Sequence, residues 1–270
     1  RGCEEMIDQA TTDMLKSMKM SAMAQEFEGQ LSEPAFKELG FEERFGLLVN
    51  AEWNRRQNNK LNRYIRDAQF SAPSACVEEI EYHEDRKLDK AQMLRFSTCN
   101  YLEEGHHIIL EGASGNGKTY IACALGNAAC RRFKRVRYIR MPELLDEMSI
   151  ARNAGDLKKL LKTYRKMDLL ILDEWLIRPL SPQESYDVLE IVESRCTQTQ
   201  HGTMIFCTQF EPDGWYKRIN PDPESDSPIS EAIMDRVIHN SYEIMIQGNI
   251  SMRERHGLKA QQKKGGGADA

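Results

Sequence analysis

The sequence predicts an α/β fold, in which a parallel sheet is wrapped by helices and preceded by a small all-α domain. Short apolar runs alternate with helical patterns through the last two thirds of the chain. This alternation is typical of a parallel sheet, because its strands are buried on both faces. The first third shows helical apolar spacing and no β-rich run. A glycine-rich turn lies between the first predicted strand and the next helix, which predicts a binding site there.

The N-terminal helical domain is predicted to cover residues 1–69. Apolar residues recur at helical spacing from Met6 to Leu31, with a break at Lys19 to Ser21, so two short helices are expected there. A second helical pattern runs from about Phe41 to Phe70. The periodicity then fades into a mixed, acidic stretch, and we interpret residues 70–95 as a linker.

An α/β core is expected over residues 96–258, with a disordered tail at 259–270, because the tail has no apolar anchor. Five strands are predicted in the core: His106 to Glu111, Val136 to Arg140, Met167 to Asp173, Thr203 to Thr208 and Tyr242 to Ile246.

Composition limits the class of protein. The 270 residues carry a formal net charge of -5, so any nucleic-acid contact must come from local basic patches. There is no membrane-length apolar run and no leader-like start, which favours a cytoplasmic protein without membrane contact. The seven cysteines are odd in number and form no CxxC pair, so we expect free thiols, no disulfide and no structural metal.

Residues 112–119, Gly-Ala-Ser-Gly-Asn-Gly-Lys-Thr, fit the phosphate-binding pattern G-x-x-x-x-G-K-[ST] between a predicted strand and a predicted helix. Glycines let backbone N–H groups converge on phosphates, and the helix directs its positive end at them. Lys118 is expected to reach the β- and γ-phosphate oxygens, and Thr119 to offer a hydroxyl to Mg²⁺. The expected nucleotide contacts are Gly112, Ala113, Ser114, Gly115, Asn116, Gly117, Lys118, Thr119 and Tyr120.

Two carboxylates follow the apolar run 169–172. Asp173 is expected to organise Mg²⁺, and Glu174 to accept a proton from an attacking water, which predicts hydrolysis. The alternative for Glu174 is a solvated strand end. No N-K-x-D sequence, which guanine specificity needs, occurs after residue 119, so ATP is favoured over GTP.

Two further elements extend the predicted site. The strand at 203–208 is followed by polar residues, and Gln209, or as second choice Thr208, is expected to position the water; a simple polar turn is the alternative. Arg236 lies in a short amphipathic helix, where it fits either a surface ion pair or an arginine finger inserted into a neighbouring subunit's site.

Taken together, "GASGNGKT", "LLILDEW", "PLSPQES", the "TQF" strand end and "AIMDRVIHNSYEI" with "GNISMRE" resemble the AAA+ ATPases of the IstB and DnaC type. The N-terminal "GFEERFGLLVNAEWNRRQNNKLNRYIRDAQF" is similar to IstB, the transposition helper, in particular. The resemblance covers about 7–258 and implies an AAA+ core without a helical lid, oligomerisation on DNA and a partner transposase. It also implies that Arg236 is an arginine finger and Arg253 a sensor-like arginine. One departure is Leu176, where such sequences usually have glycine.

Two predicted helices have a cationic face opposite an apolar one. Exposed basic faces are common on solvated helices, so DNA binding and simple solvation both remain open. Repetition around an oligomer would add phosphate contacts and favour DNA. The candidate DNA contacts are Arg55, Arg56, Lys60, Arg63 and Arg66 in the first helix, and Lys158, Lys159, Lys162 and Arg165 in the second.

The function predicted from these features is an ATP-dependent ATPase that forms homo-oligomers on duplex DNA and assists a transposase. The alternative is a replicative helicase loader of the DnaC type, which would use the same core with its N-terminal domain on a helicase. A small-molecule P-loop kinase is less favoured, because the Asp173–Glu174 pair and the late Arg236 are not expected in a kinase.

Overall fold

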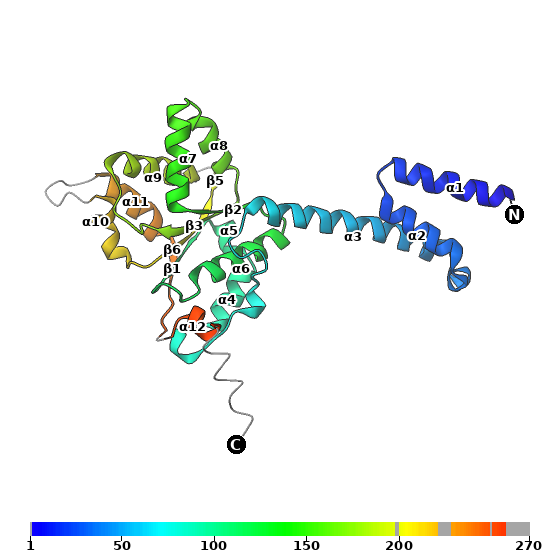
Figure 1. Cartoon of the computed structure of the whole chain (residues 1–270), viewed down its shortest axis with the longest axis horizontal. Helices are drawn as coiled ribbons and strands as arrows, with labels where there is room; N and C mark the ends of the chain where they lie inside the picture. The colour runs from blue at the N-terminus through cyan, green and yellow to red at the C-terminus, as the bar shows by residue number, and fades with distance from the viewer. Residues whose placement is uncertain (1, 198–199, 221–227, 249, 258–270) are drawn as a thin grey trace, which may run out of the picture. The chain divides into compact units, whose positions relative to one another are not determined.

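The computed structural model describes residues 2–197, 200–220, 228–248 and 250–257, and the chain divides into two compact units, Arg1–Arg63 and Tyr64–Ala270. The division falls inside helix α3 (Phe41–Ala68) rather than after residue 69. The expected disordered tail at 259–270 lies outside the described residues. Figure 1 shows the order of helices and strands along the chain.

The N-terminal unit is helical, as predicted. It contains α1 (Gly2–Ser17), α2 (Ser21–Ser32), a short 3₁₀ helix (Pro34–Glu38) and most of α3. The predicted break between α1 and α2 is confirmed, because Lys19 takes a left-handed conformation with φ 60°. Glu52 of α3 is buried and accepts a hydrogen bond from the Ala22 backbone N–H at 3.1 Å, which joins α3 to the start of α2.

The second unit is built on a five-stranded parallel sheet in the order β2-β3-β6-β1-β7. All five predicted strands are present, as β1 (His107–Glu111), β2 (Val136–Arg140), β3 (Leu169–Trp175), β6 (Thr203–Thr208) and β7 (Ser241–Met245). A separate antiparallel pair, β4 (Cys196–Thr197) and β5 (Gln200–His201), was not predicted. Since the strands are parallel, their carboxyl ends meet at one edge of the sheet, where ligands bind in such folds.

Strand β3 begins and ends two residues later than the predicted Met167–Asp173. Its pairing with β6 is irregular between Leu172 and Trp175, and Glu174 there has φ 55°. Trp175 continues the strand beyond this bulge because its side chain is buried, with its ring 4.7 Å from that of Phe206. The two carboxylates therefore lie on a bulge within β3, and not at its end.

Helices cover both faces of the sheet. Helix α6 (Lys118–Arg131) packs on one face, so closely that a Cβ at Gly126 would lie 2.5 Å from the Phe70 ring and 2.9 Å from Ile171. The other face carries an extensive apolar cluster, to which α7 (Met141–Asn153), α9 (Pro182–Arg195) and α11 (Pro228–Ile238) contribute. The remaining helices are α4 (Lys90–Ser97), α5 (Asn100–Glu104), α8 (Leu157–Arg165), α10 (Trp215–Ile219) and α12 (Met252–Arg255), with 3₁₀ turns at Val77–Glu79, Glu84–Arg86 and Pro212–Gly214.

The segment interpreted as a linker, 70–95, is part of the second unit. Phe70, Ala75, Val77 and Ile80 are all buried there. After β7, the described residues form the four-residue helix α12.

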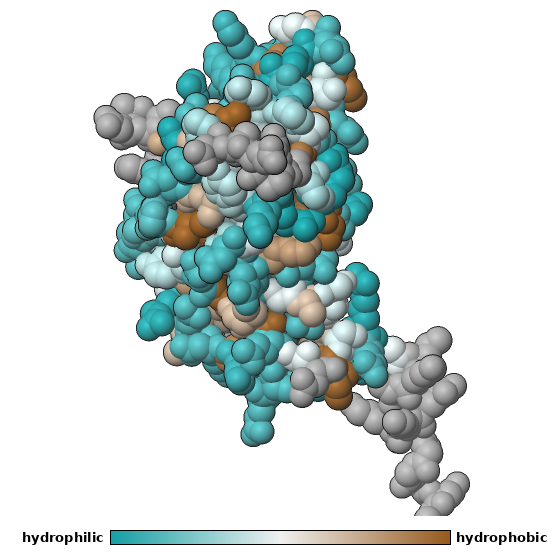
Figure 2. Space-filling view, turned by 90° about the vertical axis from the view of Figure 1, so that its left-hand side faces the viewer, coloured by the Kyte–Doolittle hydropathy of each residue, from teal (hydrophilic) through white to brown (hydrophobic). Residues whose placement is uncertain are grey.

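The surface agrees with the composition. Figure 2 shows a mostly hydrophilic face on which apolar side chains are scattered. Among the described residues, no helix combines the length and the apolar character that crossing a membrane requires. Free thiols are found at Cys76, Cys99, Cys123, Cys130, Cys196 and Cys207.

Candidate functional site

The glycine turn leaves the carboxyl end of β1 and leads into α6, as predicted. Gly112, Gly115 and Gly117 have φ of 148°, 85° and 86°, which side-chain-bearing residues rarely adopt. A Cβ at Gly112 would lie 2.3 Å from the carbonyl oxygen of Ile246, so the turn fits against the residue that follows β7 only without a side chain. The turn leads directly into the N-terminal end of α6, where unpaired backbone N–H groups favour an anion.

Lys118 holds its ammonium group inside the turn. Its Nζ donates to the carbonyl oxygens of Gly112 at 2.7 Å and Ala113 at 2.8 Å. Burial lowers the pKa of Lys118 from its ordinary value, because the charged form loses hydration. Both partners are neutral, so an incoming phosphate would be a stronger partner for this cation.

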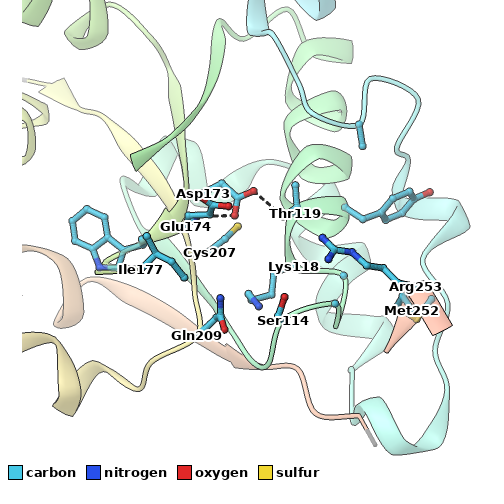
Figure 3. Close-up of a pocket in the computed structure, with 15 residues that line it drawn as sticks. Ser114, Lys118, Thr119, Asp173, Glu174, Ile177, Cys207, Gln209, Met252 and Arg253 are labelled. Carbon is cyan, nitrogen blue, oxygen red and sulfur yellow. Dashed lines mark hydrogen bonds between the residues drawn. The ribbon is translucent and has the colours of Figure 1, made fainter. Parts of the chain in front are cut away.

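Asp173 is the meeting point of β3, β2 and α6. The hydroxyl groups of Thr119 and Tyr138 each donate to its Oδ2 at 2.7 Å, and the Glu174 backbone N–H donates to its Oδ1 at 2.8 Å. Figure 3 shows the hydrogen bond between Thr119 and Asp173 as a dashed line. A hydroxyl and a carboxylate are the hard oxygen ligands that Mg²⁺ prefers, so the pair fits a magnesium ion.

Glu174 is held by an arginine that the sequence reasoning missed. The Arg140 guanidinium, at the end of β2, donates to both carboxylate oxygens of Glu174 at 2.7 Å and lies 3.6 Å from Glu143. This pairing raises the pKa of Arg140. Tyr138 and Arg140 were missed because only the pairing of β2 with β3 brings them to the carboxylates, and in that register Arg140 lies opposite Asp173.

A cavity of about 290 Å³ opens at this edge of the sheet and collects most of the predicted residues (Figure 3). It is lined by Ser114, Gly115, Gly117, Lys118, Thr119, Tyr120, Asp173, Glu174, Gln209 and Arg253, together with Ala72, Trp175, Ile177, Cys207 and Met252. Gln209 and Lys118 face the same space in Figure 3, below the two carboxylates. Of the remaining turn residues, Asn116 is buried and donates from Nδ2 to the Ile246 carbonyl at 3.0 Å.

A second hollow of about 390 Å³ adjoins the first, and both are lined by Gly117, Tyr120 and Met252. Its other walls come from the 79–86 segment and α12, namely Glu79, Glu81, Arg86 and His256. Arg86 donates to the Asn116 carbonyl at 2.8 Å, which ties this segment to the glycine turn. The sequence reasoning assigned no ligand role to this segment, because its composition resembles a linker.

Thr208 does not line the cavity. Its side chain is 1% exposed, and its hydroxyl accepts from the Phe210 N–H at 3.1 Å and donates to the Phe210 carbonyl at 3.3 Å. Because both functions of the hydroxyl are satisfied by backbone, Thr208 stabilises the turn after β6. Gln209 is left as the polar residue of this strand end that reaches the cavity.

Arg236 also lies outside the cavity, on α11. Its guanidinium donates to the Ala232 carbonyl at 2.8 Å within the same helix and to Glu193 of α9 at 2.9 Å. The ion-pair alternative is therefore present within one chain. The arginine remains 35% exposed, so the same side chain is accessible from outside.

The two cationic helices differ in how their charges are paired. In α8, Tyr164 is buried and the leucines pack on the core, while Lys158, Lys159, Lys162 and Arg165 are exposed. In α3, Arg55 and Arg56 both pair with Glu52, at 2.9 and 2.8 Å, while Arg66 pairs with Asp67 at 3.2 Å. Lys60 and Arg63 of the same helix are exposed.

Comparison with known proteins supports an ATP-binding role. The model of the IstB-like ATP binding protein family matches residues 13–260. A protein of Sinorhizobium fredii, named as an insertion-sequence ATP-binding protein, is 32% identical over 250 residues, which cover 93% of this chain and 98% of the relative. A similarly named insertion-sequence protein of Pseudomonas fluorescens is 34% identical over 70% of this chain and 82% of its own.

Two solved structures share the fold. DnaA from Aquifex aeolicus bound to AMPPCP has a TM-score of 0.53 at 19% identity, over 71% of this chain and 55% of that chain. The DnaC helicase loader has a TM-score of 0.52 at 19% identity, over 64% of this chain and 97% of that chain. The second unit thus has the AAA+ fold, and the chain belongs to the family of IstB-like ATP-binding proteins.

Proposed function

We propose that this protein is a cytoplasmic ATPase that assembles on duplex DNA in an ATP-dependent manner and assists a transposase. The ATPase assignment depends on the observation that one cavity is lined by Lys118, Thr119, Asp173, Glu174 and Gln209. The insertion-sequence names of the relatives support the link to transposition, since a helper of this kind acts beside a transposase.

Within this cavity each side chain has a role that follows from its chemistry. Lys118 binds the β- and γ-phosphate oxygens, and Thr119 with Asp173 would hold Mg²⁺, which neutralises phosphate charge when bound. Glu174 accepts a proton from the attacking water, and Gln209 orients that water. For Glu174 to act, its carboxylate must leave the Arg140 guanidinium that binds it at 2.7 Å.

The second hollow supports ATP as the nucleotide. It begins at Gly117 and Tyr120, where the first cavity ends, so one nucleotide could extend from the phosphate turn into it. Its walls include the carboxylates of Glu79 and Glu81, and the exocyclic amine of adenine donates hydrogen bonds that such groups accept. Guanine presents a carbonyl acceptor at the corresponding position, which these carboxylates would repel.

DNA binding is supported chiefly by α8. Its cations are exposed and its apolar face is packed on the core, so the charges are presented by a fixed helix. A few phosphate contacts per subunit bind DNA weakly, and an oligomer adds them along the duplex. Within the assembly we propose that Arg236 leaves Glu193 and enters a neighbour's site as an arginine finger, and that Arg253, which lines the cavity, contacts the nucleotide.

A helicase loader remains the second candidate, because the fold is also that of the DnaC helicase loader. The two candidates differ in what the basic faces contact. A loader that grips a protein partner does not need α8 for DNA, whereas the proposed function does. A small-molecule kinase is less favoured, because Glu174 in the cavity suits activation of water.

Lys118→Ala should abolish tight ATP binding, because it removes the ammonium group from the phosphate cradle. Glu174→Gln should bind ATP normally and lose turnover by about a hundredfold or more, since only proton transfer is removed. Fluorescent-nucleotide binding and phosphate release would measure the two effects, with Lys37→Ala, an exposed lysine of the N-terminal unit, as control. Equal loss of affinity in both site variants would contradict these roles.

Arg140→Gln should raise basal ATP turnover by about two- to fivefold. The ion pair with Arg140 keeps the Glu174 carboxylate away from the water and must break before Glu174 can accept a proton, but it is half-exposed and therefore weak. The matched control is Arg178→Gln, which breaks a bidentate pair of similar exposure with Glu184. Turnover below the wild-type rate in Arg140→Gln alone would mean that Arg140 positions the base and does not restrain it.

Arg236→Ala should keep ATP binding and lose at least about a thousandfold in hydrolysis, as expected for an arginine finger. Mixing these subunits with Glu174→Gln subunits should restore part of the activity. The Arg236→Ala subunit keeps its own Glu174 and can receive an arginine from its neighbour. A mixture as inactive as either variant alone would show that Arg236 acts within its own chain, where it binds Glu193.

Reversing the charge of Lys158 and Lys162 should weaken DNA binding and flatten its salt dependence. The log–log slope should fall by roughly 0.9 for each phosphate that the assembly no longer neutralises. Reversal at Arg56, Lys60 and Arg63 tests the α3 face. Fluorescence anisotropy across a salt series, with and without ATP, gives both quantities, and circular dichroism checks folding. If affinity and slope stay unchanged in both variants, the faces are merely solvated and the helicase-loader candidate is favoured.

A further inference from the structure

The phenol of Tyr138 contacts Asp173 in the candidate nucleotide site, and none of the roles proposed above involves this tyrosine. Tyr138 lies on β2, is 6% exposed and is not among the residues that line the cavity. Its hydroxyl donates to Asp173 Oδ2 at 2.7 Å, the same oxygen that accepts the Thr119 hydroxyl at 2.7 Å.

These contacts fix the rotation of the Asp173 carboxylate. Oδ1 accepts the Glu174 N–H at 2.8 Å, and Oδ2 accepts the two hydroxyl groups. The thiol of Cys207 also faces this carboxylate, but a thiol is a weak donor. Thr119 sits at the start of α6, next to the phosphate turn, so its hydroxyl is the donor that a bound metal would engage. Tyr138 is the strong side-chain donor on Asp173 that belongs to the sheet.

We propose that Tyr138 is a positioning residue, which holds Asp173 in the orientation that Thr119 and the metal–nucleotide complex require. The inference rests on the proposed function, because it assumes that Asp173 and Thr119 hold Mg²⁺ with the nucleotide. Tyr138 acts through Asp173, because it is not among the residues that line the cavity where the metal and the nucleotide would bind. Its position is set by the register of β2 and β3, in which Tyr138 lies opposite Ile171 and Arg140 opposite Asp173.

The consequence is a specific defect in magnesium dependence. Tyr138→Phe keeps the ring and its packing and removes only the hydroxyl. Asp173 then keeps Thr119 as its one hydroxyl donor among the hydrogen bonds described above, and its carboxylate gains rotational freedom. A hydrogen bond to a charged carboxylate is strong enough that its loss should cut the Mg²⁺-dependent gain in nucleotide affinity by about tenfold.

The experiment measures the affinity of a fluorescent ADP for the full chain in Mg²⁺ and in EDTA. The ratio of the two dissociation constants is the readout, and it does not depend on turnover. The control is Tyr164→Phe, which removes the hydroxyl of another buried tyrosine. That hydroxyl donates to Glu147 with an O–O distance of 2.5 Å, and neither residue lines the cavity. Tyr138→Phe should reduce the ratio about tenfold with an unchanged affinity in EDTA, while Tyr164→Phe should match the wild type.

An unchanged ratio in Tyr138→Phe would overturn the inference and leave the proposed function standing. A wild-type protein that binds no nucleotide, or binds it equally in Mg²⁺ and EDTA, would overturn the proposed function itself. A second measurement places Tyr138→Phe in an Asp173→Asn background. There the phenol should have no further effect on the ratio, and an additional loss would show that Tyr138 acts through another group.

Discussion

The hydrogen bond from Thr119 to Asp173 is the contact on which the candidate site depends. It joins the first turn of α6 to β3, although β6 lies between β1 and β3 in the sheet. Only a parallel arrangement brings the end of β1, the bulge of β3 and the end of β6 to one edge. At that edge one cavity is lined by the phosphate turn, by both carboxylates and by Gln209.

Much of the second unit could be predicted from the sequence, because buried parallel strands appear as uninterrupted apolar runs and the glycine turn has a defined spacing. Asp173, Glu174 and Gln209 were found for the same reason, since each follows such a run. Tyr138 and Arg140 could not be found this way, because the local pattern does not say that β2 pairs with β3. The choice between Gln209 and Thr208 likewise depended on backbone geometry that no residue pattern reveals.

The basic helices show why charge counts predict less than charge pairing. Helix α3 carries more cations than helix α8, but Glu52 is buried against α2 and takes both Arg55 and Arg56 as partners. Part of the α3 stripe is thereby occupied in holding the N-terminal unit together. The lysines of α8 are exposed, while the opposite, apolar face of the helix packs on the core. Helix α8 is therefore the stronger candidate surface for binding phosphates.

Leu176, the position at which the sequence departs from the resemblance, adopts φ 52° and is fully buried. Left-handed leucine is unfavourable by itself, so the conformation persists because its surroundings impose it. Its N–H lies 3.0 Å from Met141 Sδ, and its carbonyl accepts from Arg218 at 2.5 Å. Leu176 therefore acts as a fixed anchor immediately beyond the carboxylates. The backbone just after Glu174 is thus held in place on both sides of Trp175, and rotation of the Glu174 side chain is the movement that would release its carboxylate from Arg140.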